Sequence, residues 1–367
     1  MRLIISGGGT GGHIYPARAI YDKLGKVMPD CEKMYVGSRF GIEHKLLKDE
    51  EINFKEISAR GFRRGDLLYC IVSFFYFIRS LMETFCIMRK FKPDLVIGMG
   101  GFVSAPVVLM ANFMGIDSMI HEQNVVPGLS TQVLSRFAGR ILYSYKESLP
   151  FFTKYQNKLY YTGNPVRTEF QNVDREAARK KIGIAKDELL IVSMGGSNGA
   201  KTMNDLSVQI AAVVNLNPKL KYIHITGKYY DEIYRAEYDT SGYSDRVIIL
   251  PYTNDMPNLM AAADLMIARA GAITLAEMAS VALPGIIIPS LNVARDHQTH
   301  NAKAFDKVGG TVVLREDELD LTAFRDLVQE LCEKPEKLAR MRSAYSEKIR
   351  EDALASIMSL IYDYNLK

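Results

Sequence analysis

Short apolar segments rich in valine and isoleucine alternate with longer amphipathic segments along most of the chain. This alternation is typical of βαβ units, in which helices connect parallel, buried strands. We expect six strands in the first half of the chain, at 2–6, 33–36, 53–57, 95–98, 118–121 and 140–143. We expect six more in the second half, at 189–194, 222–226, 247–250, 265–268, 285–289 and 311–314. Helices are expected between them, for example over 14–26 and 104–114.

The pattern starts twice. Each half opens with a strand that runs into a glycine cluster, at 7–12 and at 195–199. This predicts an α/β fold of two doubly wound domains that face each other across a cleft, with the carboxyl ends of both sheets toward it. The turn residues near 161–165 predict a boundary there, with domains over 1–163 and 164–346. The helical segment 347–367 has no strand of its own, and we expect it to pack back on the first domain.

The composition narrows the class of protein. A chain of 367 residues exceeds what one core usually serves, and its 48% hydrophobic and 24% charged residues are those of a folded protein. The net charge of +4 is small and disfavours a nucleic-acid partner. Four scattered cysteines fit neither a disulfide framework nor a zinc site. The N-terminus lacks the apolar stretch of a signal peptide, so we expect the protein to stay in the reducing cytoplasm.

The first glycine cluster, GGGTGGH at 7–13, suits an anion. Glycines let the backbone approach a phosphate, and the helix that follows offers free N–H groups. A dinucleotide site is the alternative, but it needs an acidic residue at the end of the second strand. That strand ends in Gly37-Ser38-Arg39, and only Arg39, as a partner for a 2′-phosphate, supports a nicotinamide enzyme.

The second cluster, GGSNGAKT at 195–202, has two other interpretations. It matches the G-x-S-x-G of α/β-hydrolases, for which Asp264 and His297 would complete a triad. It also falls one glycine short of a P-loop. Neither explains the first cluster or a third one, GMGG at 98–101. Three such loops suit two substrates that both carry diphosphates.

Two further segments carry polar residues after strands. RAGAITLAE at 269–277 offers helix amides to a diphosphate, and its Glu277 either binds a ribose or is a solvated helix residue. Asp296-His297-Gln298 and Asn301 follow the strand at 285–289. His297 and His300 lack a third ligand, and the chain has no D-x-D, so we expect no metal site.

Taken in order, GGGTGGHIYPA, GMGGFVSAP, HEQNVVPG, GNPVR, GGSNGA, RAGAITLAE and DHQTHNA resemble the MurG family, over about residues 3–315. These are the N-acetylglucosaminyltransferases of peptidoglycan synthesis. The resemblance implies a GT-B fold and no tightly bound cofactor. It implies UDP-N-acetylglucosamine as donor and undecaprenyl-pyrophosphoryl-muramyl-pentapeptide (lipid I) as acceptor. It also implies inverting transfer to the acceptor's 4-hydroxyl to give lipid II, at the cytoplasmic face of the membrane.

The resemblance also implies site residues. The donor-binding residues would be Thr10, Gly11, Gly12, Asn124, Arg167, Ser197, Thr253, Ala272, Ile273, Thr274, Leu275, Ala276, Glu277 and Gln298. The loops for the acceptor diphosphate would contain Gly9, His13, Gly100 and Gly101. Asn198 stands where many members have Gln. Thr253 stands where an aliphatic residue is common, so its main chain is the part expected to meet the uracil.

Inversion requires a base for the acceptor hydroxyl. His13 is the first candidate, because histidine titrates near neutrality. The alternatives for His13 are a helix cap or a contact to the acceptor phosphate, and Glu122 is the lower-ranked candidate base.

The longest apolar run, LLYCIVSFFYFI at 67–78, is shorter than the roughly 20 residues that span a bilayer. Either a buried helix or a helix resting on the membrane would explain it. Flanking cations favour docking on anionic headgroups: Arg60, Arg63, Arg64, Arg79, Arg89, Lys90 and Lys92. We predict that Phe74, Phe75 and Phe77 include at least one exposed aromatic ring. A UDP-N-acetylglucosamine 2-epimerase is the alternative within the same fold, and a nicotinamide oxidoreductase or a membrane-binding scaffold the alternative outside it.

Overall fold

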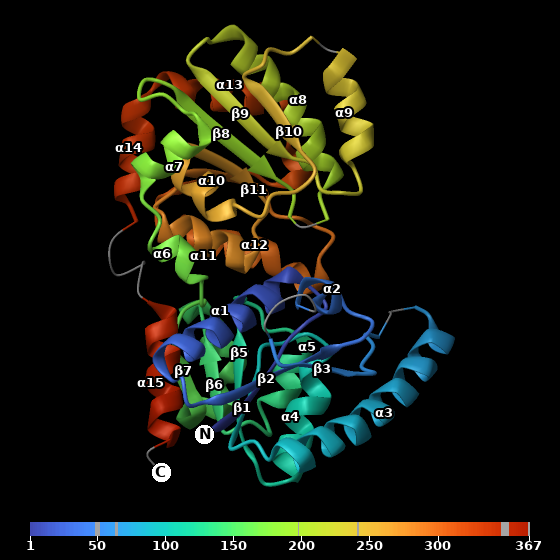
Figure 1. The fold of residues 1–367 in the computed structure, drawn as a ribbon. Helices are drawn as coiled ribbons and strands as arrows, with labels where there is room; N and C mark the ends of the chain where they lie inside the picture. The colour runs from blue at the N-terminus through green and yellow to red at the C-terminus, as the bar shows by residue number, and fades with distance from the viewer. Residues whose placement is uncertain (48–51, 63–64, 197, 241, 346–351, 366–367) are drawn as a thin grey trace. The chain divides into compact units, whose positions relative to one another are not determined.

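The computed structural model describes residues 1–47, 52–62, 65–196, 198–240, 242–345 and 352–365, and the chain divides into two compact units. The N-terminal unit comprises Met1–Arg167 with Asp352–Lys367, and the C-terminal unit comprises Thr168–Glu351. Each unit contains a parallel sheet covered by helices (Figure 1). The boundary expected at 163/164 lies close to this division.

The N-terminal sheet has the strand order β3-β2-β1-β4-β5-β6-β7, and every pair is parallel. Its strands are β1 (Arg2–Ser6), β2 (Glu32–Ser38), β3 (Phe54–Ile57), β4 (Leu95–Gly98), β5 (Asp117–Glu122), β6 (Arg140–Tyr143) and β7 (Leu159–Tyr161). Its helices are α1 (Gly11–Val27), α2 (Glu43–Leu47), α3 (Leu67–Phe91), α4 (Ser104–Phe113), α5 (Leu129–Leu134), the 3₁₀ segment η1 (Lys146–Lys158) and α15 (Ala353–Asn365).

The middle of the central strand β1, residues 3–5, is apolar on both sides because both faces of the sheet are covered. Leu3 and Ile5 pack on one face in a cluster with α1 and α15, whereas Ile4 packs on the other face with α4. Helix α15 also accepts a hydrogen bond from Arg140 of β6 at the carbonyl of Leu360, 2.8 Å away. The C-terminal helix therefore belongs to the core of the N-terminal unit, although 347–351 of the expected segment lie outside the described residues.

The C-terminal sheet has the order β10-β9-β8-β11-β12-β13, again with every pair parallel. Its strands are β8 (Leu189–Met194), β9 (Leu220–Ile225), β10 (Val247–Leu250), β11 (Leu265–Ala268), β12 (Gly285–Ile287) and β13 (Thr311–Val313). Its α-helices are α6 (Thr168–Gln171), α7 (Arg175–Ile182), α8 (Lys201–Leu216), α9 (Asp231–Thr240), α10 (Met256–Ala262), α11 (Ala272–Ser280), α12 (His297–Asp306), α13 (Leu321–Glu333) and α14 (Pro335–Ser343). Two 3₁₀ turns, η2 (Ala294–Asp296) and η3 (Glu316–Glu318), flank α12 and β13.

All twelve expected strands are confirmed, with ends that differ by at most two residues. The strand β7 was missed, because its three residues precede the turn-rich segment and are only partly buried. In each sheet the strand order reverses beside the first strand, between β1 and β4 and between β8 and β11. The loops at such a switch point diverge and leave room for a ligand.

Helix α3 is longer than the apolar run that predicted it. The Asp66 side chain caps its first turn by accepting from the amide of Tyr69, 2.9 Å away, and the helix continues for 25 residues to Phe91. By length and composition alone it is long and apolar enough to cross a membrane, with a mean hydropathy of 1.6 over its most apolar window. The apolar run 67–78 is therefore too short to span a bilayer, whereas the whole helix is not. One narrow face of α3 packs on α4.

Candidate active site

The first and third glycine clusters lie against each other at the switch point of the N-terminal sheet. A Cβ on Gly101 would lie 2.2 Å from the carbonyl oxygen of Gly8, and a Cβ on Gly7 would lie 2.8 Å from the Cβ of Met99. Gly100 and Gly101 also have φ of +94° and +76°, which favours glycine. Glycine is therefore required here for the two loops to touch.

His13 lies in the first turn of α1, beside the third glycine cluster. A Cβ on Gly100 would be 2.9 Å from its Nδ1, so the imidazole ring fills the space that this glycine leaves open. The same Nδ1 is 3.1 Å from Oε1 of Gln123, which follows β5. The segments GGGTGGH, GMGG and HEQN thus meet at one imidazole ring.

Glu122 is buried and is held by its own loop. One carboxylate oxygen accepts from the amide and the side-chain nitrogen of Asn124, at 3.0 and 3.1 Å, and the other accepts from the amide of Gly128 at 3.0 Å. These contacts stabilise the turn over 122–128 and orient Asn124. The geometry favours a structural role for Glu122 over proton abstraction.

The start of α1 presents backbone amides. Thr10 is the N-cap residue in an extended conformation, and its carbonyl accepts from the amides of His13 and Ile14 at 3.1 and 3.2 Å. The amides of Gly11 and Gly12 precede the first intrahelical bonds, so they belong to the positive end of the helix. Arg167 lies over the Tyr15 ring, with 5.1 Å between Cζ and the ring centroid, which places a guanidinium beside the same helix.

Glu43 is a site residue that the sequence analysis missed. Its carboxylate is fully buried and accepts from the amides of Gly9 and Ser38, at 3.0 and 2.9 Å. A Cβ on Gly8 would lie 2.2 Å from this carboxylate. The Gly9 amide, expected at the acceptor diphosphate, is therefore engaged by an internal anion. In sequence, Glu43 stands among polar residues of a short helix, and no local pattern marks it as buried.

This arrangement also bears on the dinucleotide alternative. The first acid after β2 along the chain is Glu43, and its oxygens bind loop amides rather than facing a ribose. Arg39, the expected partner of a 2′-phosphate, lies 3.6 Å from the carboxylate of Glu83.

In the C-terminal unit the second glycine cluster packs closely on β9. Gly199 has φ of +77°, and a Cβ there would lie 2.0 Å from the carbonyl oxygen of Thr226. Below the loop, buried Ser193 and Asn204 bind the two ring nitrogens of His224, at 2.7 and 2.8 Å. Burial lowers the pKa of His224 to about 3, so this ring is neutral. Ser197 lies outside the described residues.

The P-loop alternative is not supported by the position of its lysine. Nζ of Lys201 is 2.7 Å from the Asp205 carboxylate, one turn along α8 on an exposed face. A P-loop lysine would instead have to reach the phosphates held by the loop.

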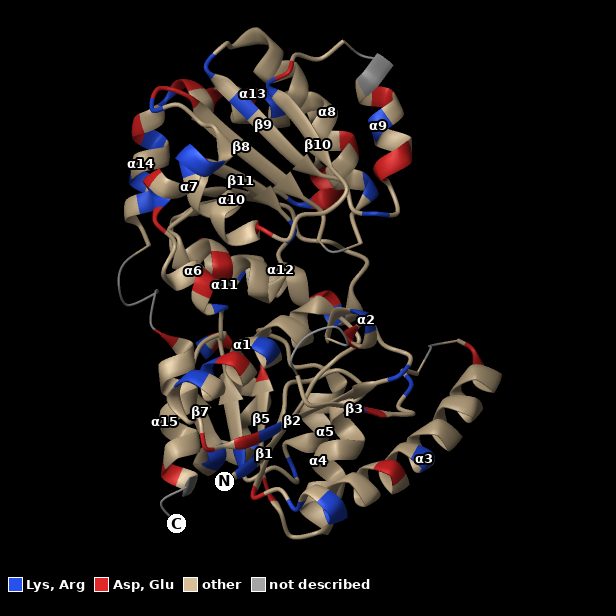
Figure 2. Cartoon of the chain, viewed as in Figure 1, with Lys and Arg blue, Asp and Glu red and all other residues tan. Residues whose placement is uncertain are grey.

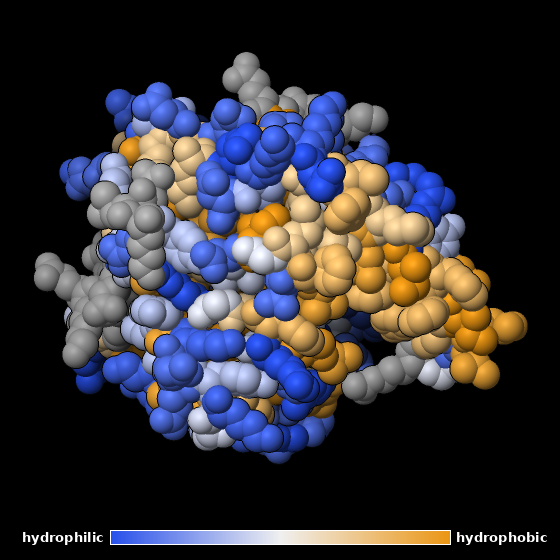
Figure 3. Space-filling model, turned by 90° about the horizontal axis from the view of Figure 1, so that it is seen from below, coloured by the Kyte–Doolittle hydropathy of each residue, from blue (hydrophilic) through white to orange (hydrophobic). Residues whose placement is uncertain are grey.

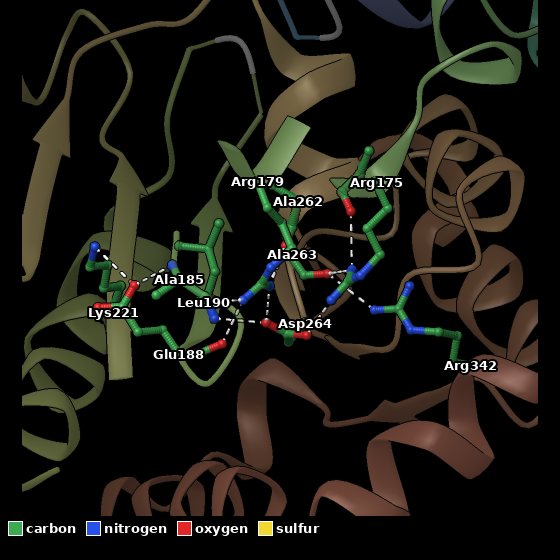
Figure 4. A network of polar contacts seen from close by, with 11 residues as sticks. Arg175, Arg179, Ala185, Glu188, Leu190, Lys221, Ala262, Ala263, Asp264 and Arg342 are labelled. Carbon is green, nitrogen blue, oxygen red and sulfur yellow. Dashed lines mark hydrogen bonds and ion pairs between the residues drawn. The ribbon is translucent and has the colours of Figure 1, made fainter. Parts of the chain in front are cut away.

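The hydrolase alternative is not supported by Asp264, which anchors secondary structure (Figure 4). Its carboxylate accepts from Arg175, from Arg179 at 2.9 Å and from the amide of Leu190 at 2.9 Å. The same two arginines also bind carbonyls of residues 261–263 at the end of α10. Asp264 therefore joins α7 and α10 to the sheet.

The start of α11 presents backbone amides that precede the first hydrogen bonds of the helix. Gly271 is its N-cap, Ala272, Ile273 and Leu275 are buried, and Thr274 and Ala276 are half-buried. Glu277 is only 6% exposed, so the interpretation as a solvated helix residue was wrong. Arg269, buried just before this turn, donates to the Ile288 carbonyl at 3.2 Å and pairs with Glu316. Glu316, which no sequence pattern indicated, also accepts from Thr202.

Gln298 and Thr253 are both engaged by neighbouring backbone. Oε1 of Gln298 accepts from the amide of Ser290 at 2.8 Å, and Oγ1 of Thr253 accepts from the amide of Asp255 at 3.1 Å. The residues before Gln298 are strained: Arg295 and Asp296 have φ of +59° and +50°. Within the described ranges the structure contains no group of three potential metal ligands.

Comparisons with known proteins identify the family of the chain. Residues 3–143 match the glycosyltransferase family 28 N-terminal domain, and residues 190–357 match its C-terminal domain. Two relatives are named UDP-N-acetylglucosamine--N-acetylmuramyl-(pentapeptide) pyrophosphoryl-undecaprenol N-acetylglucosamine transferase. The one from Acetivibrio thermocellus is 40% identical over 93% of this chain and 92% of its own. The one from Desulfitobacterium hafniense is 38% identical over 99% of both chains.

Solved structures give the same result. The crystal structure of Acinetobacter baumannii MurG is 26% identical over 99% of both chains, with a TM-score of 0.74. A putative UDP-N-acetylglucosamine 2-epimerase from Listeria monocytogenes has a TM-score of 0.72 over 98% of this chain and 95% of its own, at 14% identity, and so shares the fold alone. The fold is GT-B, as expected. Likeness over nearly the whole chain shows that the protein belongs to the MurG family of glycosyltransferases, within glycosyltransferase family 28.

Proposed function

We propose that this protein transfers N-acetylglucosamine from UDP-N-acetylglucosamine to the 4-hydroxyl of undecaprenyl-pyrophosphoryl-N-acetylmuramyl-pentapeptide, in peptidoglycan synthesis. The observation that carries the proposal is the likeness at 36–40% identity to relatives named for this reaction, over 92–99% of their length. Three motifs of the N-terminal unit also converge on His13, as a site for chemistry requires.

The reaction is a single displacement with inversion. The acceptor oxygen forms a bond to C1 of the α-linked sugar, the bond from C1 to the phosphate oxygen breaks, and UDP leaves with the electron pair. The hydroxyl proton passes to His13, and the product linkage is β. General-base assistance of this kind contributes ~10²–10⁴-fold. His13 suits the role better than Glu122, whose carboxylate is occupied by three donors of its own loop.

The donor diphosphate fits the start of α11. The amides after Gly271 form the positive end of a nine-residue helix. The buried Arg269 lies just before them, paired with Glu316. Electrostatic stabilisation of a leaving group is usually the largest catalytic contribution. Glu277, buried one turn further, would accept from ribose hydroxyls.

The side-chain hydrogen bonds of Gln298 and Thr253 indicate which of their other groups would contact the donor. Because Oε1 of Gln298 accepts from Ser290, its amide nitrogen is the group oriented to donate to sugar hydroxyls. Because the Thr253 hydroxyl is bound to Asp255, its main chain is the part that would meet the uracil. The contacts of Thr10, Gly11, Gly12, Asn124, Arg167 and Ser197 to the donor are likewise proposals.

The acceptor diphosphate would lie at Gly100 and Gly101, next to His13. Gly9 would shape this region rather than bind the phosphate, since its amide donates to Glu43.

Helix α3 is the proposed membrane contact, at the cytoplasmic face. Phe74 and Phe75 are 53% and 67% exposed, which confirms the expected exposed aromatics, whereas Phe77 is half-buried. Exposed residues Leu67 and Leu68 extend the apolar surface, which Figure 3 shows as a continuous orange area. Amphipathic surfaces of this kind bind at the headgroup boundary.

Cations accompany this surface. Figure 2 shows that α3 carries few charges along its length. Arg79 is exposed, and Arg89 and Lys90 lie in the last turn, where they would contact anionic headgroups. Arg60 lies over the Tyr69 ring at 4.2 Å, and Arg63 and Arg64 lie outside the described residues.

The decisive experiment measures UDP release from UDP-N-acetylglucosamine with and without a short-chain analogue of the lipid-linked muramyl-pentapeptide. Release that requires the analogue, with a β-linked disaccharide product, supports the proposal. Release without acceptor would contradict it and favour the epimerase alternative.

A further inference from the structure

The buried amide of Gln123 lies among four polar groups in the N-terminal unit. Its Nε2 is 2.9 Å from the carbonyl oxygen of Met99, 3.2 Å from the carbonyl oxygen of His121 and 3.1 Å from Nδ1 of His121. Its Oε1 is 3.1 Å from Nδ1 of His13. Gln123 therefore connects two histidines, only one of which the proposed mechanism uses.

The two carbonyl oxygens determine which way this amide points. A carbonyl oxygen only accepts hydrogen bonds, so the NH₂ group of Gln123 must face Met99 and the oxygen must face His13. The reversed amide would place oxygen against oxygen at 2.9 and 3.2 Å. Because Oε1 is an acceptor, Nδ1 of His13 must carry the hydrogen in this contact.

The protonation of His121 agrees with this orientation of the Gln123 amide. Nε2 of His121 lies 3.0 Å from the Gly163 carbonyl oxygen, which only accepts, so the hydrogen of the neutral ring is on Nε2. Nδ1 is then the acceptor that faces the NH₂ group of Gln123. Burial lowers the pKa of His121 to about 4, so the ring remains neutral and its Nδ1 remains an acceptor near pH 7. The two hydrogens of the Gln123 NH₂ group are shared among three acceptors, namely the carbonyl oxygens of Met99 and His121 and Nδ1 of His121.

We propose that Gln123 is a positioning residue that holds neutral His13 with its hydrogen on Nδ1 and its lone pair on Nε2. Nε2 is then the nitrogen that takes the proton of the acceptor hydroxyl. The Gly100 backbone limits the ring position, and Gln123 sets the tautomer. This inference rests on the proposed function for the identity of the reaction, but the tautomer can be observed without any substrate. A base histidine in the wrong tautomer loses most of its effect.

The direct test is nitrogen NMR of protein labelled with ¹⁵N in its histidine rings. The chain has six histidines, so the His13 signals can be assigned by their loss in His13→Ala. At a pH where the ring is neutral, we expect the hydrogen of wild-type His13 on Nδ1. A hydrogen on Nε2 would overturn the inference, whether or not any variant folds.

The matched substitution is Gln123→Met, which keeps the length of the side chain and removes both the acceptor that faces His13 and the NH₂ donor. We expect the His13 tautomer to shift toward Nε2–H and kcat to fall about 10- to 100-fold, with the KM for UDP-N-acetylglucosamine changed less than about threefold. The control is Gln132→Met, which removes a glutamine hydrogen bond to the Pro127 carbonyl in the same unit. The control should leave both the tautomer and kcat unchanged.

The outcomes separate this inference from the proposed function. A loss of kcat in Gln123→Met with the His13 tautomer unchanged would indicate a structural effect and overturn the positioning role. A shifted tautomer with kcat unchanged would support the positioning role and contradict His13 as the base. In that second case His13→Ala would also keep more than about a tenth of the wild-type turnover.

Discussion

The substitution Asp264→Ala should destabilise the C-terminal unit more than any change at an exposed acid. Asp264 faces Arg175 and Arg179, and the guanidinium of Arg342 binds the same stretch of backbone at the Ala263 carbonyl, 3.1 Å away (Figure 4). Burial, followed by repulsion from Arg175, lowers the pKa of Arg342 to about 10, while Asp264 opposes this shift. Without Asp264, three partly buried cations face one another with no carboxylate between them.

The loss of unfolding free energy in Asp264→Ala depends on how deeply Asp264 and its arginine partners are buried. Breaking a buried ion pair from one side costs about 3–5 kcal/mol. The side chains of Asp264 and Arg175 are 20% and 35% exposed, so solvent screening reduces this contribution. The lost hydrogen bond to the Leu190 amide adds about 1 kcal/mol. We therefore expect a loss of about 2–4 kcal/mol, or about 5–15 °C in the Tm of a unit of this size.

Calorimetric unfolding of both variants measures this loss. The control is Asp187→Ala, because the Asp187 side chain is 73% exposed and lies 4.0 Å from Lys219. Exposed pairs contribute at most about 1 kcal/mol, so the control should melt within about 3 °C of wild type. If Asp264→Ala melts as the control does, the reasoning that this carboxylate anchors α7 and α10 is wrong.

Three other variants test the site and the pH response. His13→Ala should lower turnover ~10²–10⁴-fold, and retention of more than a tenth in the UDP-release assay would exclude the base role. Replacing Phe74 and Phe75 together by Ser should weaken binding to anionic vesicles at least about tenfold, because both rings are exposed apolar surface. Turnover of a short-chain acceptor should stay unchanged. Unaltered vesicle binding would argue against α3 as the membrane contact. Burial lowers the pKa of His224 in the folded state to about 3, below its unfolded value of about 6.5. The unfolded state therefore binds the proton first as pH falls. The free energy of unfolding should decrease as pH drops from about 6.5 to about 3. That loss is about 2 kcal/mol at pH 5, and urea midpoints at pH 7 and pH 5 should differ less in His224→Gln than in wild type.

The parallel sheets and the glycine loops could be predicted because their causes are local in sequence. Strands buried on both faces appear as continuous Val- and Ile-rich segments, and a glycine cluster directly after a strand marks a switch-point loop. The family resemblance then supplied the substrates, which no spacing of residues indicates.

Long-range contacts explain what the sequence did not predict. Glu43 is buried only because a loop from another part of the chain closes over it. Helix α3 continues past Arg79 because that residue lies on the exposed side, where a charge does not end a helix. The buried face of α3 consists of Ser73, Ser80, Thr84 and Met88. Small polar residues on a buried face do not stand out in a hydropathy pattern.

The carboxylate of Glu43 has a consequence for transplanting this loop. Because it binds the amides of Gly9 and Ser38 from within, the GGGTGGH backbone is held in shape before any phosphate arrives. The ligand then need not supply the ordering free energy of the loop, which improves affinity without any added contact. A graft of the seven residues into another scaffold would lose this support. The transferable module is therefore the loop together with α2 and the end of β2, since the anion that shapes the loop comes from there.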